Sequence, residues 1–490
     1  MLIRGAELED GAIKDVRVEN GCITAIDKLD PRHNERIVDA CGGLLLPGLH
    51  DHHMHVAALA ASLTSVRCGP PEVTDASSFF DCLQAPGTDW LRATAYHESV
   101  AGLLDAVTLD RVVTHRPLRV QHRSGRMWFF NSAGLDRLLS NHAPPPGLEL
   151  EGGRYTGRLI DEDAWLQQAL ASEPPSFAQV GEMLLRSGIT GLTDMSPAND
   201  AFMARHFAEQ ATNGSLPQRV LLAGAQSLAK QDASERVSLG PLKLHLHEAH
   251  LPPLDTTTHS IRRAHDANRA VAVHCTTHVE LLYALRAFQE ASPMMGDRIE
   301  HASVTDDLAL TKIAQLGLAV LAQPHFIHER GDAYLADVDP QARPHLYRLR
   351  AFLDAGVTLA GGSDAPFGGH DPWAAMTAAI SRRTRQLAVI GEHEALSPEE
   401  ALDLYLRAPQ ALSERRHVAV GARADLCLLD RPWRQACKNL SSAHVRATFI
   451  DGRQVFNRVD QPPVQSRLGA DPPAGQDHQR RALPADSPRH

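Results

Sequence analysis

The chain of 490 residues is too long for one small domain, and its 43% content of hydrophobic residues can fill a sizeable core. The formal net charge is −10 at pH 7, and the spread of lysine and arginine along the chain argues against nucleic acid or an anionic membrane as a partner. No stretch approaches the ~20 apolar residues that cross a bilayer, and the first residues lack the apolar core of a secretion signal. We therefore expect a cytoplasmic protein that acts on a small molecule, and homo-oligomer formation stays open.

The seven cysteines are scattered along the chain, and none forms a Cys-x-x-Cys pair. This pattern argues against a disulfide framework and against a structural zinc site made of thiolates. We expect reduced thiols at Cys22, Cys41, Cys68, Cys82, Cys275, Cys427 and Cys437.

Both ends of the chain have the pattern of short strands joined by tight turns. Residues 1–46 carry apolar runs around an Asn20-Gly21 turn signal, and residues 445–457 have the same character around Asp451-Gly452. We predict one small β-sandwich domain built from residues 1–46 and 420–457. Residues 458–490 have few large apolar side chains and many Pro, Gln, Asp and Arg, which predicts a disordered tail.

Between the two ends, apolar strand-like runs alternate with helical stretches. Such alternation implies parallel strands joined by crossover helices, and Lys243, His274 and His301 are spaced by about one βα unit each. The predicted fold class is α/β: a TIM-like (β/α)8 barrel over residues 47–419, beside the β-sandwich. Residues 65–176 are the least regular part, and we expect them to form an insertion, or lid, over the barrel mouth. The strand-like runs are 188–194, 240–247, 270–275, 297–303, 317–324 and 356–364.

The strongest chemical signal is Pro47-Gly-Leu-His-Asp-His-His-Met-His55, directly after four apolar residues. Side chains on a strand alternate between its faces, so His53 and His55 share one face with Asp51, and the other two histidines point away. Two imidazoles two residues apart can bind one metal. An isolated His-x-His pair is often only a solvated loop, but the apolar run and the Pro-Gly pair place this one at a strand end.

Three later residues also end predicted strands, which in a barrel is the face where active sites form. His274 ends one strand, His301 the next and Asp364 the last of the series. Each alone is better explained as a hydrogen-bonded structural residue. Together with His53 and His55 they predict a metal site, because neutral imidazole and carboxylate suit Zn²⁺ and its neighbours.

Lys243 lies on the same predicted strand as His245 and His247. An inward lysine is costly unless it is paired or modified. A carboxylated lysine would be an anion able to bridge two metal ions, whereas an ordinary ion pair with Glu248 is the alternative. The sequence therefore leaves open whether one or two divalent ions, with Zn²⁺ expected, are bound.

At these positions the chain resembles the amidohydrolase superfamily of metal-dependent hydrolases, and within it the branch of N-substituted formamide deformylases and related amidohydrolases. The resemblance implies His53, His55, His274, His301 and Asp364 as metal ligands, Asp364 also as proton shuttle, and Lys243 as the bridging lysine. It spans roughly residues 1–457. The motifs that carry it are residues 47–55, Asn131-Ser132, Gly188-Ile-Thr-Gly191, Lys243, His274, His301, Gln323-Pro324, Gly362-Ser-Asp-Ala-Pro366 and Gly421-Ala-Arg-Ala-Asp-Leu426.

Two departures from the branch lie where the substrate would bind. Arg126 stands where the branch commonly has histidine, and His247-Glu248 stands where it commonly has Asp-Gly. The substrates of the branch are therefore not transferred to this chain. Candidate substrate-facing residues are Arg126, Trp128, Asn131, His325 and Arg348.

The function hypothesis is a metal-dependent hydrolase that cleaves a C–N bond of a small molecule with metal-activated water. Three alternatives stay open. They are a mononuclear deaminase of the same superfamily, a relative of the D-aminoacylases that bridges its metals through Cys68 or Cys82, and a non-catalytic metal-binding scaffold.

Overall fold

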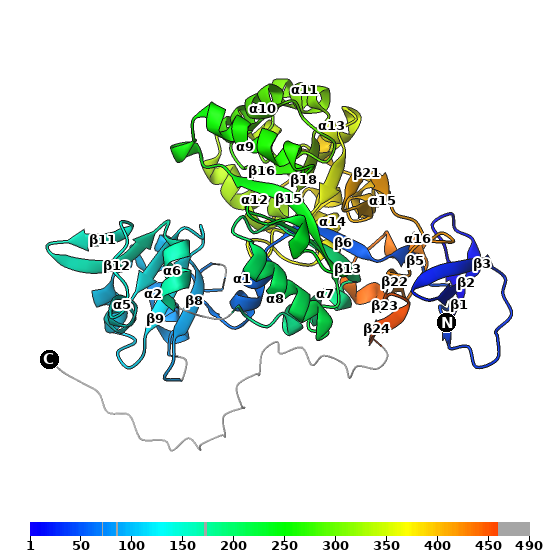
Figure 1. Cartoon of the computed structure of the whole chain (residues 1–490), viewed down its shortest axis with the longest axis horizontal. Helices are drawn as coiled ribbons and strands as arrows, with labels where there is room; N and C mark the ends of the chain where they lie inside the picture. Colours follow the sequence, from blue (N-terminus) through cyan, green and yellow to red (C-terminus); the bar gives the residue numbers. More distant parts are fainter. Residues whose placement is uncertain (71, 85–86, 171–173, 459–490) are drawn as a thin grey trace, which may run out of the picture.

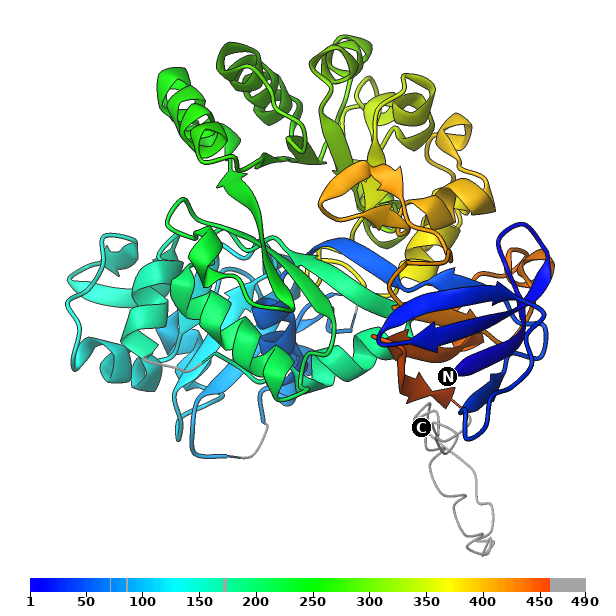
Figure 2. The same ribbon diagram turned by 45° about the vertical axis from the view of Figure 1, so that its right-hand side comes forward.

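The computed structural model describes residues 1–70, 72–84, 87–170 and 174–458 of the chain. The barrel strands and their helices form the middle of the molecule, with the 66–170 insertion on one side and the strands of both chain ends on the other (Figure 1; Figure 2). The predicted tail, residues 458–490, lies outside the described residues except for Arg458. Among the described residues, no helix combines the length and apolar character needed to span a membrane.

The central sheet has eight strands, and every neighbouring pair in it is parallel. Its two outer strands come together at their ends, where the backbone N–H of Asp364 donates to the carbonyl of His53 at 2.7 Å. The predicted fold class is thus confirmed, and β14 is a strand that the sequence patterns did not single out. In spatial order the strands are β6 (Leu49–Met54), β13 (Ile189–Asp194), β14 (Arg219–Gly224), β15 (Val237–His245), β16 (Val271–Cys275), β17 (Arg298–His301), β18 (Ala319–Ala322) and β19 (Leu359–Gly361).

Helices follow the barrel strands and bury their apolar faces against them in one large core. The helix α10 shows the local cause, since Thr277 caps its start and Glu280 completes a capping box, while Leu281 and Phe288 enter the core. The barrel helices are α1 (Val56–Leu63), α7 (Ala178–Arg186), α8 (Ala201–Thr212), α9 (Leu254–Asp266), α10 (His278–Ala291), α11 (Asp307–Leu316), α12 (Phe326–Asp337), α13 (Leu349–Asp354), α14 (Pro372–Ser381) and α15 (Pro398–Asp403).

The strands of the two chain ends form two four-stranded sheets that share one hydrophobic cluster, in which Ile3 and Val16 meet Leu426 and Phe449. The N-terminal sheet has the order β3-β2-β1-β4, and the C-terminal sheet has the order β24-β23-β22-β5. Their strands are β1 (Leu2–Glu7), β2 (Ile13–Glu19), β3 (Cys22–Asp27), β4 (Ile37–Asp39), β5 (Leu45–Pro47), β22 (Leu426–Leu429), β23 (Val445–Ile450) and β24 (Arg453–Asn457).

The insertion is more regular than its sequence indicates, because a six-stranded sheet runs through it in the order β11-β12-β10-β9-β8-β7. Its Pro-rich turns hid strands that only their pairing reveals, and the aromatic residues of one of them, Trp128, Phe129 and Phe130, are buried. The elements are β7 (Val66–Arg67), β8 (Leu91–Tyr96), β9 (Leu118–His122), β10 (Met127–Phe130), β11 (Leu148–Glu151) and β12 (Arg154–Ile160), with α2 (Ala76–Cys82), α3 (Glu98–Ala101), α4 (Ala106–Asp110), α5 (Ser132–Leu139) and α6 (Asp163–Leu170).

The insertion reaches the barrel through the turn between β9 and β10. Arg126 contacts His247, which follows β15, and a side-chain carbon at Gly125 would lie 3.3 Å from the ring of Phe367, which follows β19. These contacts lie at the carboxyl ends of the barrel strands. Smaller elements complete the chain: β20 (Arg407–Ala408), β21 (Ala411–Arg415), α16 (Trp433–Ala436) and the short 3₁₀ turns 230–232, 248–250, 343–345, 392–394 and 442–444.

Candidate metal centre

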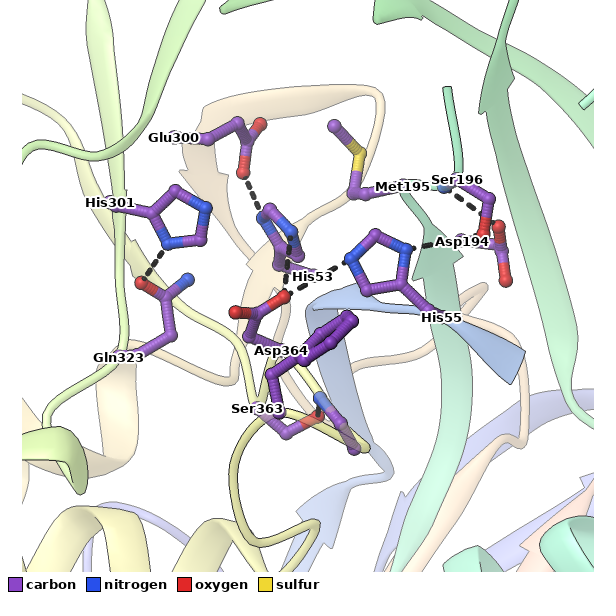
Figure 3. Close-up of polar contacts among 12 residues, drawn as sticks. His53, His55, Asp194, Met195, Ser196, Glu300, His301, Gln323, Ser363 and Asp364 are labelled. Carbon is purple, nitrogen blue, oxygen red and sulfur yellow. Dashed lines mark hydrogen bonds and ion pairs between the residues drawn. The ribbon is translucent and has the colours of Figure 1, made fainter. Parts of the chain in front are cut away.

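His53, His301 and Asp364 meet at the carboxyl ends of the barrel strands, with one ligand atom of each within 4.8 Å of the others. The Nε2 atom of His53 lies 3.3 Å from Oδ1 of Asp364, and the Nε2 atom of His55 lies 3.1 Å from the same oxygen. Figure 3 shows the imidazoles of His53 and His55 pointing at this carboxylate. The structure therefore brings together residues separated by more than 300 positions in the sequence.

The backbone of His301 and Asp364 is left-handed, with φ of 70° and 52°. This conformation is uncommon for residues other than glycine and costs on the order of 1–3 kcal/mol. On a regular strand, His301 would point to the face opposite Glu300, yet both side chains lie beside His53. The turn at the end of β17 thus re-aims His301 into the site, which alternation along the strand does not predict.

His274 completes the layer from the neighbouring strand. The register of β15 and β16 pairs it with His245, and the two rings stack with centroids 4.2 Å apart. The ring of His274 lies 4.5 Å from that of His301. Burial lowers the pKa of His301 to about 3, and so keeps it neutral, which is the form in which imidazole binds metals.

Lys243 extends from β15 into the same region with only 4% of its surface exposed. Its Nζ atom has no hydrogen-bond partner among the described residues, so the alternative ion pair with Glu248 is not formed. Burial lowers the pKa of this amine, although the charges of Glu300 and Asp364 oppose the shift. A buried amine without a partner is costly, which favours pairing or modification when the site is filled.

Glu300 is a site residue that the sequence patterns missed. Its carboxylate contacts Nδ1 of His53 and accepts a hydrogen bond from Nε of Arg298 at 2.7 Å. Burial alone raises the pKa of Glu300, but the charges of Arg298 and His53 hold it well below its usual value. Its position next to His301, with Arg298 two residues before it, was the available signal.

Neighbouring side chains fix the orientation of the imidazole rings of His301 and His55. His301 donates from Nδ1 to the side-chain oxygen of Gln323 at 2.7 Å, which leaves its Nε2 buried without a partner among the described residues. Nδ1 of His55 lies 3.2 Å from the hydroxyl of Ser196. Partners on the second ring nitrogen are typical of histidines that bind metals, because they set the tautomer.

Asp51 of the first motif positions the chain instead of entering the cluster. One of its oxygens accepts from the backbone N–H groups of His53 and Ser363, both at 3.0 Å. These bonds tie β6 to the loop that carries Asp364. Burial raises the pKa of Asp51 to about 6.

Among the predicted substrate-facing residues, Arg126 lies at the barrel mouth. Its guanidinium pairs with Asp161 and donates to Nε2 of His247. Both departures from the related branch, Arg126 and His247, therefore contact each other. The two departures from the related branch therefore change one region of the barrel mouth, not two separate regions.

The other candidates have structural partners. Asn131 is fully buried in the insertion and makes four hydrogen bonds, with the N–H groups of Leu118 and Gly134 and the carbonyls of Val113 and Arg116. These bonds give it a structural role, and its contact with substrate stays a prediction.

His325 is also buried, and its Nε2 donates to the carbonyl of Ser363 beside Asp364. Trp128 donates to Asp163 within the insertion, and Arg348 pairs with Asp307 and Glu394.

The candidate bridging thiols are Cys68 and Cys82. They bond to the carbonyls of Thr94 and Phe79 and pack in the core of the insertion. Both thiols therefore lie in the insertion, and neither is placed to bridge metal ions at the barrel cluster.

A parallel barrel with histidines and an aspartate converging at the carboxyl ends of its strands defines the class of metal-dependent hydrolases. The donor set also suits a divalent metal, since it offers neutral imidazoles, a carboxylate and the unpartnered buried nitrogens of His301 and Lys243.

The chain belongs to the amidohydrolase family, whose profile matches residues 36–456. An N-substituted formamide deformylase from Arthrobacter pascens is 27% identical over 491 residues, which cover 86% of this chain and 90% of that protein. An uncharacterised metal-dependent hydrolase from Pyrococcus horikoshii OT3 has the same fold, with a TM-score of 0.71 at 18% identity, covering 91% of this chain and 99% of that one. A similar hydrolase from Pyrococcus furiosus gives a TM-score of 0.69 at 21% identity, covering 88% and 98%.

These matches confirm the family that the sequence motifs indicated. Family membership identifies the chain as a hydrolase that acts on carbon–nitrogen bonds with the help of a metal. The bond that is cleaved and the residues that act on it depend on the chemistry of the site, not on the fold.

Proposed function

We propose that the chain hydrolyses the C–N bond of an amide or amide-like small molecule at the cluster around Asp364. The observation that carries this proposal is the convergence of His53 and His55 on one oxygen of Asp364, with the unpartnered Nε2 of His301 beside them. Outside a metal site, a buried imidazole nitrogen without a partner would be an uncompensated cost.

The residues that hold the metal are His53, His55, His274, His301 and Asp364. Zn²⁺ is the ion that this set of nitrogen and oxygen donors suits best. Lys243 would decide between one ion and two, because its carboxylated form would be an anion able to help hold a second ion. A bound divalent metal supplies Lewis-acid activation of water and of the scissile carbonyl.

Asp364 moves the proton. Burial raises the pKa of its carboxyl, but the bonds from His53 and His55 hold that pKa well below its usual value, so the group is ionised. It takes a proton from the attacking water and delivers it to the departing nitrogen. Glu300 and Gln323 orient the rings of His53 and His301 around it.

The substrate binds at the barrel mouth, where the turn between β9 and β10 of the insertion meets the barrel. The relative from Arthrobacter pascens is named for N-substituted formamides, and this class opens the list of candidates. Arg126 offers a planar cation at the mouth, which suits a carboxylate or carbonyl oxygen on the substrate.

The test is metal quantification followed by a substrate screen. The screen covers formamides, N-acyl amino acids, ureido compounds, cyclic amides and aminated heterocycles, and it scores amine and ammonia release separately. We expect amine release from an amide class, and roughly 10²-fold or greater loss of turnover in Asp364→Asn, the scale of general acid–base catalysis. His274→Ala should also be inactive.

The matched control is Asp266→Asn, which removes an exposed carboxylate far along α9. Near-normal turnover in metal-loaded Asp364→Asn would overturn the role of this residue. Ammonia as the product, with one metal per barrel, would replace the proposal by a deaminase.

A further inference from the structure

A second group of histidine and carboxylate side chains lies in the insertion, away from the barrel site. His97 directly follows β8, Glu98 begins α3, and His122 ends β9. The strands β8 and β9 are parallel neighbours, and their register pairs Tyr96 with His122. The topology therefore brings both residues to the carboxyl ends of two neighbouring strands, β8 and β9, which Figure 1 shows in the insertion.

The three side chains converge on one point. Oε2 of Glu98 lies 2.9 Å from Nε2 of His122 and 3.6 Å from Nε2 of His97, and one ligand atom of each residue lies within 4.8 Å of the others. Tetrahedral donors at ordinary zinc distances lie about 3.4 Å apart. The observed separations straddle that value, and Glu98, with 56% of its side chain exposed, is free to adjust.

Each imidazole has a serine on its other nitrogen. Nδ1 of His97 lies 2.8 Å from the hydroxyl of Ser99, and Nδ1 of His122 lies 2.8 Å from the hydroxyl of Ser124. The backbone N–H of each serine also donates to the same Nδ1 at 3.2 Å, so without a metal Nε2 carries the ring proton. Binding of a metal at Nε2 would move that proton to Nδ1, which would then donate to the serine hydroxyl. The same arrangement on two separate histidines orients both Nε2 atoms toward Glu98.

The group is half open to water. The side chains of His97 and His122 are 22% and 17% exposed, which leaves room for water ligands beside three protein donors. Two imidazoles and a carboxylate suit Zn²⁺, Co²⁺, Ni²⁺ or Cu²⁺, whereas Mg²⁺ and Ca²⁺ prefer oxygen donors throughout.

The group also lies at the base of the turn that reaches the barrel mouth. The carbonyl of His122 accepts from the N–H of Gly125, and the hydroxyl of Ser124 accepts from the N–H of Arg126 at 3.4 Å. Gly125 approaches the ring of Phe367, which packs edge-on against His55 with centroids 5.6 Å apart. The turn that begins at His122 is therefore linked to His55 of the barrel cluster through Gly125 and Phe367.

We propose that His97, Glu98 and His122 form a second site for a divalent transition metal, and that the ion holds the 122–126 turn against the barrel mouth. The site is independent of the reaction proposed for the barrel.

The first test counts metal ions on the full chain. Wild type and the His97→Ala/His122→Ala variant are stripped with a chelator, reloaded with Zn²⁺, desalted and analysed for zinc per chain. We expect the variant to hold one ion fewer, with an unchanged far-ultraviolet spectrum. The matched control, His33→Ala/His115→Ala, removes two exposed histidines and should hold as many ions as wild type. Equal zinc content in wild type and His97→Ala/His122→Ala would overturn the site.

The second test follows the turn by amide hydrogen exchange. Zinc should slow exchange at residues 122–126 roughly 10-fold in wild type, because the ion must be released before the turn can open. In His97→Ala/His122→Ala, zinc should leave exchange there unchanged. Zinc binding without slower exchange in wild type would overturn the tethering role, and slowing that persists in the variant would assign the effect to the barrel ion.

Discussion

Glu300 contacts Nδ1 of His53 with one carboxylate oxygen while the other accepts from Arg298. All three side chains are buried, so the carboxylate balances the arginine charge and sets the tautomer of the histidine at once. This arrangement leaves Nε2 of His53 pointing at Asp364. Glu300 thereby connects the stability of the barrel interior to the geometry of the candidate metal centre.

Replacing Glu300 with glutamine should weaken metal binding and the fold together. The substitution removes the carboxylate that orients His53, and partners of this kind are worth roughly 10- to 100-fold in metal affinity. It also leaves the Arg298 charge unpaired in the interior, which costs on the order of 3–5 kcal/mol. Zinc affinity by chelator competition and the melting temperature measure the two effects.

The double variant Arg298→Met/Glu300→Gln separates these effects. Without the buried charge the melting temperature should recover in part, while zinc affinity stays low. Recovery of both, or of neither, would show that Glu300 does not act on His53 in the way described.

Lys243 should carry a carboxyl group when the barrel site is filled. Its Nζ is buried and has no hydrogen-bond partner among the described residues, although Glu300 and Asp364 are close enough to shift its pKa. We expect a carbamate resonance after loading with zinc and ¹³C-bicarbonate, and we expect Lys243→Ala to lose one zinc ion and the resonance.

The metal count for Lys243 is best made in the His97→Ala/His122→Ala background, so that only barrel ions are measured. Lys28→Ala, which removes an exposed lysine, is the matched control. One ion per barrel in both proteins, with no carbamate resonance, would leave a mononuclear site.

Arg126→Ala should raise KM more than it lowers kcat. The guanidinium lies at the mouth, where it contacts His247 and Asp161, and it does not contact Asp364 in the structure. A charge-assisted hydrogen bond to substrate is worth about 1.5–3 kcal/mol, or roughly 10- to 100-fold in KM. Steady-state kinetics on the substrate found in the screen measure the change. Arg154→Ala, an exposed arginine of the insertion, is the control, and a fall in kcat alone would contradict the prediction.

The N-terminal sheet should lose stability in acid through Glu35. The hydrogen bond from Arg17 lowers the pKa of this carboxyl from 4.5 to about 2, despite the opposing effect of burial. A depressed folded-state pKa stabilises the protein above pH 4.5, and that stabilisation is lost as the pH falls from 4.5 to 2. Glu35→Gln should therefore lower the melting temperature at pH 6 and lose this effect by pH 2.

The exposed Glu151 provides the control for this titration, because Glu151→Gln should have little effect at either pH. A melting difference for Glu35→Gln that is constant across the range would show that the pair with Arg17 acts through packing instead of charge. Thermal melts followed by circular dichroism at five pH values are sufficient.

Local patterns were enough to predict the barrel and most of its cluster. Apolar runs at βα spacing predict parallel strands, and all parallel strands present their carboxyl ends at one rim. His53, His274 and Asp364 could therefore be expected together from their places at strand ends. The family motifs pointed to the same residues, and the family match confirms the class of protein.

Contacts between distant segments decided the rest. Asn131 matched a motif, but its role as a buried cap depends on where the turns around Leu118 and Val113 come to lie. The sheet of the insertion was hidden because its strands are short and their pairing, not their composition, defines them.

By itself, the sequence determined the barrel, its rim and the residue types that collect there, because strand and helix periodicities are properties of neighbouring residues. The tertiary structure decided which of these side chains face each other. His301 enters the site through a left-handed backbone, Glu300 acquires its role from Arg298 and His53, and Arg126 reaches His247 across a turn of the insertion. The contacts of Glu300 with His53 and of Arg126 with His247 join segments 247 and 121 residues apart, and local patterns do not record such packing.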